Sequence, residues 1–245
     1  MSGIWIMKNS INIDEKNKIK YKYNFDAVLR EYLVRELQIY FIDGDAIELG
    51  CYHGDFTKNI AKYFSKVYAV DSSIEAINIS KLNNIENITY INQFFEELDL
   101  STKVNNIFMV HSYEHVKNRK DLLNTVKKYL SGSGRLFIVV PNAHAASRQI
   151  ASSMVVVDYN HVVTKYEEEH GHHETFSFDT LNFELKQAGF KVIKSGGVMF
   201  KPLANYQLDL CLQHEVIDRE FLEGCYMLGS IYPELCASIY SVCEL

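Results

Sequence analysis

The chain has 245 residues, enough for one large domain, or one domain with a modest lid, that buries a sizeable core. Its 47% hydrophobic and 23% charged residues are ordinary values for a globular protein. The formal net charge of −6 argues against a duplex-binding surface, which needs a net basic footprint, so we expect no nucleic-acid partner.

The cysteines and the apolar runs indicate the cellular setting. The five cysteines are odd in number and include no Cys-x-x-Cys pair, which favours reduced thiols over a disulfide framework or a zinc knuckle. No signal peptide is visible, and the longest apolar run, residues 136–141, is too short to cross a bilayer. We therefore expect a soluble, cytoplasmic protein with no membrane partner.

Short apolar strands alternate with amphipathic helices along most of the chain. After a polar lead-in or cap at residues 1–24, an apolar stripe predicts a helix over residues 25–40. The predicted strands are 46–50, 67–71, 88–92, 107–111, 135–140, 190–194 and 236–242. The later helices are predicted at 55–64 with Asp55 as N-cap, 73–82, 119–130, 178–188 capped by Gly189, and 205–228.

This alternation predicts an α/β fold, a Rossmann-like, doubly wound and mostly parallel sheet. We expect seven strands, with an antiparallel last strand and a helical C-terminal insert. The helices from residue 205 onward carry enough apolar residues to form a homodimer face or to roof a binding pocket.

The turn after the first predicted strand has the composition of a cofactor-binding loop. Gly50 and Gly54 suit a tight turn and a close backbone approach to a ligand. Asp71 ends the second strand a little over twenty residues after the loop begins, where a carboxylate can accept both ribose hydroxyls of an adenosine. Glu48 opens the loop, and an acid there suits a cofactor with a cationic end rather than a pyrophosphate.

These residues resemble the class I S-adenosylmethionine-dependent methyltransferases, whose usual loop is E/D-x-G-x-G-x-G; here Tyr52 replaces the middle glycine. The resemblance covers residues 46–142 and implies S-adenosylmethionine as cofactor, with S-adenosylhomocysteine as product. It places Glu48 and Gly50 at the methionine end and Asp71 at the ribose. The implied cofactor-binding residues are Glu48, Gly50, Tyr52, Gly54, Asp71, Ser72, Gln93, Phe94 and Phe95 (flanking the adenine), and His111 (beside the methionine).

Four further clusters follow this loop along the chain: Glu114-His115-Val116, Pro141-Asn142-Ala143-His144 with Arg148, Gly171-His172, and Gly196-Gly197 with Lys201. As a set they are similar to a bacterial subgroup of sugar and surface-polysaccharide methyltransferases, of the capsule or O-antigen type. The resemblance implies methyl transfer to a hydroxyl of a sugar or a nucleotide-linked sugar. A phosphoramidate-type capsule precursor or an amino-sugar nitrogen is the alternative acceptor.

A hydroxyl acceptor benefits from a base that removes its proton, and histidine suits this task near neutral pH. His172 is the first candidate, with His115 and His144 next. The expected acceptor-binding residues are Glu114, Asn142, Arg148 and Lys201, the last two suited to a phosphate.

The resemblance implies one methyltransferase domain over residues 1–245. Its cofactor-binding core spans 25–142, and acceptor-site insertions occupy 143–176 and 196–235. A metal held by His170, His172 and Glu114 is conceivable, but three histidines within four residues are not a standard ligand spacing, so no metal is predicted.

Two functions from other classes compete. A nicotinamide-dependent oxidoreductase shares the loop spacing, but the chain lacks the G-x-G-x-x-G phosphate cradle. A non-catalytic adenosyl-binding protein is the second alternative, and Tyr52 in the loop is the feature in its favour.

Overall fold

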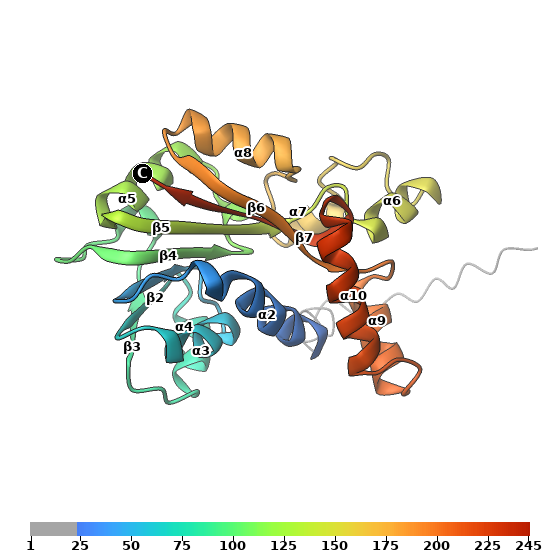
Figure 1. Ribbon diagram of the computed structural model, residues 1–245, viewed down its shortest axis with the longest axis horizontal. Helices are drawn as coiled ribbons and strands as arrows, with labels where there is room; N and C mark the ends of the chain where they lie inside the picture. Colours follow the sequence, from blue (N-terminus) through green and yellow to red (C-terminus); the bar gives the residue numbers. More distant parts are fainter. Residues whose placement is uncertain (1–23) are drawn as a thin grey trace, which may run out of the picture.

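The computed structural model describes residues 24–245, which form one seven-stranded sheet with helices on both faces (Figure 1). The lead-in predicted over residues 1–24 lies outside the described residues, apart from Asn24. The strands are β1 (Ala46–Leu49), β2 (Val67–Asp71), β3 (Ile88–Asn92), β4 (Val104–Val110), β5 (Leu130–Pro141), β6 (Lys191–Phe200) and β7 (Cys236–Glu244).

The strand order is β3-β2-β1-β4-β5-β7-β6. The pairs among β1 to β5 are parallel, whereas β7 runs antiparallel to both of its neighbours, β5 and β6. The predicted seven-stranded, mostly parallel sheet with an antiparallel last strand is confirmed.

Apolar residues on both faces of the central strands create two hydrophobic cores. In β4, Ile107 and Met109 face one core, and Phe108 and Val110 face the other. Because both faces of such a strand are buried by helices, its consecutive residues are apolar. Helices α2, α3, α4, α9 and α10 contribute side chains to one core, and α5 and α8 to the other, as their positions on either side of the sheet in Figure 1 show.

The described residues form the helices α2 (Asn24–Leu37), α3 (Asp55–Ile60), α4 (Ile74–Lys81), α5 (Arg119–Tyr129), α6 (Ala146–Ser153), α7 (Lys165–Glu169), α8 (Phe178–Gln187), α9 (Asn205–Gln213) and α10 (Arg219–Ile231). Of these, α2, α3, α4, α5 and α8 begin and end close to the predicted residues. Ser73 caps α4 by accepting a hydrogen bond from the Ala76 amide, and Gly189 follows α8 with a left-handed φ of 85°. The short helices α6 and α7 lie in the predicted insertion 143–176.

Two predicted helix boundaries are wrong. Gly54, not Asp55, is the N-cap of α3, and Asp55 is its first residue, paired with Lys58 at 2.6 Å. The predicted helix 205–228 is two helices, because the chain turns at Glu215 (φ 55°) and Asp218 caps a new helix through the Phe221 amide.

Strand β6 continues through Gly196 and Gly197, which were predicted to follow the strand. The sheet can accommodate them because neither carries a side chain. A Cβ at Gly197 would lie 2.1 Å from the Pro233 carbonyl oxygen, and one at Gly196 would lie 2.4 Å from the Tyr240 hydroxyl. Tertiary contacts therefore require glycine at both positions inside the strand.

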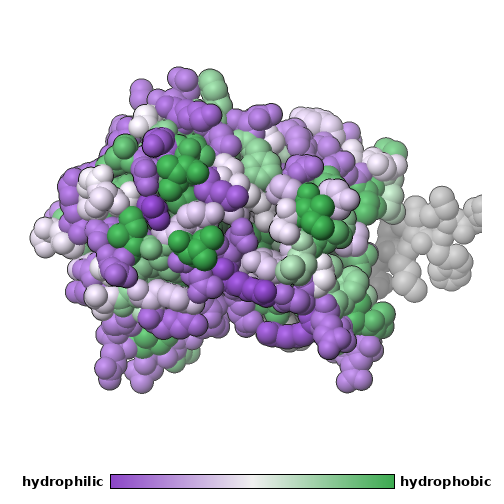
Figure 2. Space-filling model, viewed as in Figure 1, coloured by the Kyte–Doolittle hydropathy of each residue, from purple (hydrophilic) through white to green (hydrophobic). Residues whose placement is uncertain are grey.

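Within residues 24–245, no helix has both the length and the hydropathy needed to cross a membrane. On the face drawn in Figure 2, hydrophilic residues surround separate hydrophobic patches rather than one continuous apolar band.

Candidate functional site

A cavity of about 710 Å³ opens at the carboxyl ends of the central parallel strands. The strand order reverses between β1 and β4, which is the point where open α/β sheets bind ligands. Helix α2, the segments after β1 to β4, and the loop after α7 all contribute lining residues. A cavity of this size suits a cofactor together with a small second ligand.

The loop after β1 forms the floor of the cavity. Gly50 has a left-handed φ of 88°, and a Cβ there would lie 2.5 Å from the Ser112 Cβ. Ser112 follows β4 and donates its hydroxyl to the Leu49 carbonyl at 2.7 Å. The glycine therefore lets the ends of β1 and β4 meet closely beneath the cavity.

Asp71, at the end of β2, faces the same cavity. Its carboxylate accepts hydrogen bonds from the amides of Tyr52 and Ser73, both at 2.9 Å. The Tyr52 ring stacks on the His53 ring, with centroids 3.7 Å apart, and both side chains belong to the cavity wall. The tyrosine that replaces the usual glycine leaves the acid directed toward the cavity.

Glu48 is a buried acid at the end of β1. Its carboxylate accepts a hydrogen bond from the Thr57 hydroxyl at 2.5 Å. Burial raises the pKa of Glu48 to about 8, against the opposing effects of the Thr57 hydrogen bond and the positive charge of Arg30. A cationic ligand group beside this carboxylate would stabilise its ionised form.

Arg30 of α2 also lines the cavity and lies 2.9 Å from Nδ1 of His111. Because a guanidinium only donates, Nδ1 accepts, and Nε2 then donates to the Ser238 hydroxyl at 2.8 Å. Burial and the charge of Arg30 hold the pKa of His111 well below its usual value. His111 is therefore a neutral imidazole fixed at the end of β4.

Phe94 and Phe95, which follow β3, line the cavity, and Phe94 is 60% exposed. Phe95 is partly buried against the core beneath. Gln93 does not line the cavity; its amide nitrogen on the main chain donates to the Asp71 carbonyl. Ser72 does line it, beside Asp71.

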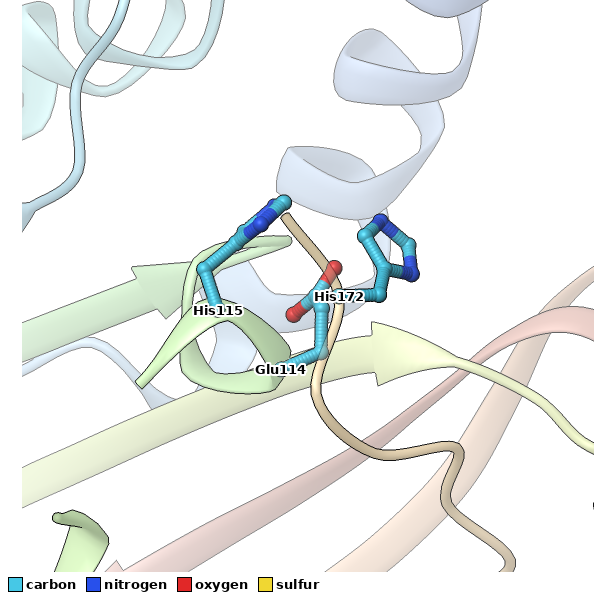
Figure 3. A group of neighbouring side chains, drawn as sticks. All are labelled: Glu114, His115 and His172. Carbon is cyan, nitrogen blue, oxygen red and sulfur yellow. The ribbon is translucent and has the colours of Figure 1, made fainter. Parts of the chain in front are cut away.

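A cluster of Glu114, His115 and His172 occupies another part of the cavity wall (Figure 3). One ligand atom of each residue lies within 4.8 Å of the other two. Glu114 and His115 belong to the short helix η4 (Tyr113–His115) after β4, and His172 lies in the loop after α7. The two imidazole rings meet edge to face, with centroids 4.7 Å apart.

The acid and the histidine of this cluster both have shifted pKa values. Glu114 is 1% exposed, and no other residue whose side chain the structure describes forms a hydrogen bond with its carboxylate. Burial raises the pKa of Glu114 to about 8. Burial and the neighbouring His115 lower the pKa of His172 to about 4, so His172 is neutral at pH 7.

The insertion that carries His172 is anchored by a half-buried ion pair. Arg148 of α6 lies 2.6 Å from Glu167 of α7 and also donates to the carbonyls of Asn160 and Val162. The His173 amide then donates to the Glu114 carbonyl at 2.9 Å. These bonds hold the loop after α7 against η4.

Six of the predicted site residues do not line the cavity: Gly54, Gln93, Asn142, His144, Arg148 and Lys201. Gly54 is the N-cap of α3, and Arg148 forms an ion pair with Glu167. The Asn142 amide group donates to the carbonyls of Glu234 and Cys236 and thereby joins β5 to the start of β7.

His144 and Lys201 have partners of their own away from the cavity. His144 lies 3.1 Å from His161, Nε2 to Nε2. Lys201 is buried, lies over the Phe25 ring and donates to the Leu203 carbonyl. Burial lowers the pKa of Lys201 to about 8.

Sequence reasoning missed the contribution of α2. Asp26 and Arg30 both line the cavity, whereas no residue from 196–235 does. The signal was present, because the two charged residues are four apart and share one side of a helix whose other side is apolar. The predicted roof instead packs against α2 and β6, with Leu208 and Leu222 in the core.

Residues 21–195, well over half of the chain, match the family model described as a methyltransferase domain. Among curated proteins, the chain is 31% identical over 110 residues to the tRNA/tmRNA (uracil-C(5))-methyltransferase of Campylobacter lari. That match covers 40% of this chain and 32% of the relative, so the chain spans about a third of the relative's length. A Campylobacter jejuni protein of the same description matches at 31% over 30% of its length.

Solved structures match over nearly the whole chain. The plantazolicin methyltransferase BpumL in complex with SAH has a TM-score of 0.60 and 18% identity, covering 95% of this chain and 91% of its own. The DhpI–SAH complex has a TM-score of 0.58 and 15% identity, covering 94% and 90%. A methyltransferase from Clostridium acetobutylicum has a TM-score of 0.56 and 11% identity, covering 96% and 99%. At such identities these likenesses show a shared fold.

Proposed function

The chain belongs to the methyltransferase domain family and uses S-adenosylmethionine as its methyl donor, and we propose that it methylates a hydroxyl of a sugar or a nucleotide-linked sugar. One observation carries the proposal. Asp71, Glu48 and the cluster of Glu114, His115 and His172 all line a single cavity. An adenosyl donor and a small polar acceptor can therefore meet within it.

The cavity offers a complementary group for each part of the donor. Asp71 suits the ribose hydroxyls, Phe94 and Phe95 suit the adenine ring, and Glu48 suits the ammonium of the methionine end. The guanidinium of Arg30, on α2, would face the donor's carboxylate. The BpumL and DhpI structures contain SAH, which supports an adenosyl ligand in this fold.

The reaction needs positioning and removal of one proton. The methyl carbon leaves the sulfonium, whose sulfur keeps the electron pair of the broken bond, and the acceptor oxygen forms the new bond. The hydroxyl proton passes to solvent or to a neighbouring base. Holding the two reactants in line accounts for most of the acceleration. The Glu114, His115 and His172 cluster supplies the polar groups that orient and activate the acceptor.

Two variants should separate the donor part of the site from the acceptor part. Asp71→Ala removes the ribose acceptor and should weaken SAH binding about 10- to 100-fold. His172→Ala should leave SAH affinity within about twofold and lower kcat about 10²- to 10⁴-fold. Calorimetric titration with SAH and methyl transfer to a panel of sugars, nucleotide sugars and amino sugars measure both. Glu86→Gln, on an exposed loop, is the matched control for Asp71→Ala.

The position of the methyl group on the product decides the acceptor atom. NMR of product made with ¹³C-methyl donor distinguishes an O-methyl from an N-methyl carbon. Methylation of nitrogen alone would replace the hydroxyl proposal with the amino-sugar alternative. SAH binding without transfer to any carbohydrate would reject the whole acceptor class.

A further inference from the structure

We propose that Glu114, His115 and His172 bind a divalent transition-metal ion within the cavity, and that the open positions of this ion take an oxygen of the acceptor. The role of the ion toward the acceptor rests on the proposed function. The binding of the ion does not, because it depends only on these three side chains.

The donor set is the first argument. Two imidazoles and one carboxylate are ligands for first-row divalent ions such as Zn²⁺, Mn²⁺ and Co²⁺. Three protein ligands leave positions open for water or substrate, which is the pattern of a catalytic rather than a structural site. Figure 3 shows the Glu114 carboxylate lying between the two imidazole rings.

The environment of Glu114 is the second, independent argument. Its carboxylate is buried at the cavity wall, and among the described side chains and amides no other residue donates a hydrogen bond to either oxygen. Buried carboxylates are almost always hydrogen-bonded, paired with a cation or bound to a metal. Arg30 lines the same cavity, but its guanidinium contacts His111 and makes no hydrogen bond with Glu114.

The distances fit a site that closes slightly on binding. Ligand atoms around one ion at about 2.0–2.2 Å are about 3–3.5 Å apart, so the present separations of up to 4.8 Å must shrink by about 1 Å. The proposal requires the His172 side chain to move by about this amount on binding, while the His173 amide stays bonded to the Glu114 carbonyl. Gly171 (φ 84°) already brings that loop close to His115: a Cβ there would lie 3.4 Å from the His115 Nδ1.

A bound ion would have a direct effect on the transfer. A divalent cation lowers the pKa of an oxygen it binds, so the acceptor hydroxyl would lose its proton to solvent near neutral pH. The imidazoles would then act as ligands and not as the base. This proposal gives two of the three predicted catalytic histidines, His115 and His172, one shared function as ligands.

Cobalt spectroscopy tests the site without relying on activity. We expect chelator-treated full-length protein to bind one Co²⁺ with visible absorption bands, and Glu114→Gln and His172→Ala to weaken this binding at least about 100-fold. His173→Ala, one residue further along the same loop, should retain it. Titration with SAH shows that each variant is folded, and His115→Ala substitutes for any variant that is not.

The outcomes separate this proposal from the proposed function. Wild-type protein that binds SAH but no Co²⁺, Mn²⁺ or Zn²⁺ would overturn the metal site and leave the methyltransferase intact. Equal metal binding by wild type and the ligand variants would identify the metal as adventitious and also overturn it. In the activity assay, we expect a chelator to abolish transfer and Mn²⁺ or Zn²⁺ to restore it; transfer at full rate in the chelator would contradict the ion's role toward the acceptor.

Discussion

At the scale of single residues, the site depends on polar groups that are buried before any ligand binds. Glu48 is the clearest example, because the Thr57 hydroxyl donates to its buried carboxylate and burial raises its pKa to about 8. Glu114 is buried in the same way, and no other residue whose side chain the structure describes donates to its carboxylate. Such groups lower the stability of the free protein and favour cationic ligands.

The raised pKa of Glu48 predicts a pH dependence of stability. Because the folded pKa lies above the usual value of 4.5, the unfolded chain loses its proton first as pH rises. Below pH 4.5, Glu48 is protonated in both the folded and the unfolded chain, and its stabilising contribution is complete. Between pH 4.5 and about 8, the free energy of unfolding should fall by about 2–4 kcal/mol as this contribution is lost.

Glu48→Gln tests this assignment. In urea titrations, the free energy of unfolding of the variant should change less with pH across that range. We expect wild-type protein to bind SAH more tightly as pH rises toward 8 and Glu48 ionises, and the variant should not show this increase. Parallel pH curves for variant and wild type would show that another group titrates in this range.

At the scale of elements, the insertion containing α6 and α7 positions the part of the cavity wall that carries His172. Arg148 and Glu167, with side chains 14% and 15% exposed, connect the two helices, and the following loop presents His172. Arg148 was predicted to bind an acceptor phosphate. The structure places it outside the cavity lining and gives it three partners within the insertion.

We therefore expect Arg148→Met to destabilise the protein by about 1.5–3 kcal/mol, because the half-buried Glu167 carboxylate loses its charged partner and keeps only the hydrogen bonds from Thr164. It should also lower kcat while SAH affinity stays unchanged. Arg219→Met is the control: its ion pair with Glu31 is exposed, and its loss should cost about 0–1 kcal/mol. Thermal unfolding and SAH titration measure both. Full stability combined with a raised acceptor KM would restore the phosphate-binding role.

At the scale of the whole molecule, α2 connects the N-terminal half of the sheet and its helices to the C-terminal half. Its residues pack against α3, α9 and β6. Glu36 of α2 accepts hydrogen bonds from the hydroxyls of Tyr226 on α10 and Tyr240 on β7, at 2.9 and 2.7 Å. Arg30 of the same helix lines the cavity. A change in how α2 packs against the C-terminal half would therefore also change the cavity wall.

Glu36→Ala should lower the free energy of unfolding by about 2–4 kcal/mol, because it leaves two tyrosine hydroxyls without an acceptor. Tyr226→Phe removes one donor and should cost about 1 kcal/mol. Urea unfolding followed by fluorescence should show one transition for both variants. Two separate transitions in Glu36→Ala would mean that the halves fold independently.

The amino-acid sequence by itself determined the strand and helix alternation, the glycine loop after β1 and the acid at the end of β2. These features are local, since apolar periodicity and turn residues act over a few positions. The family resemblance predicts ten cofactor-binding residues, and eight of them line the cavity.

Only the tertiary structure decided which distant side chains meet. Glu114 and His172 are far apart in the sequence, and the anchored insertion brings them together. Arg148, Lys201 and Asn142 have charged or polar side chains typical of binding sites, yet partners elsewhere in the fold hold them away from the cavity. A side chain's chemistry can be read from the sequence, but its partner depends on long-range packing.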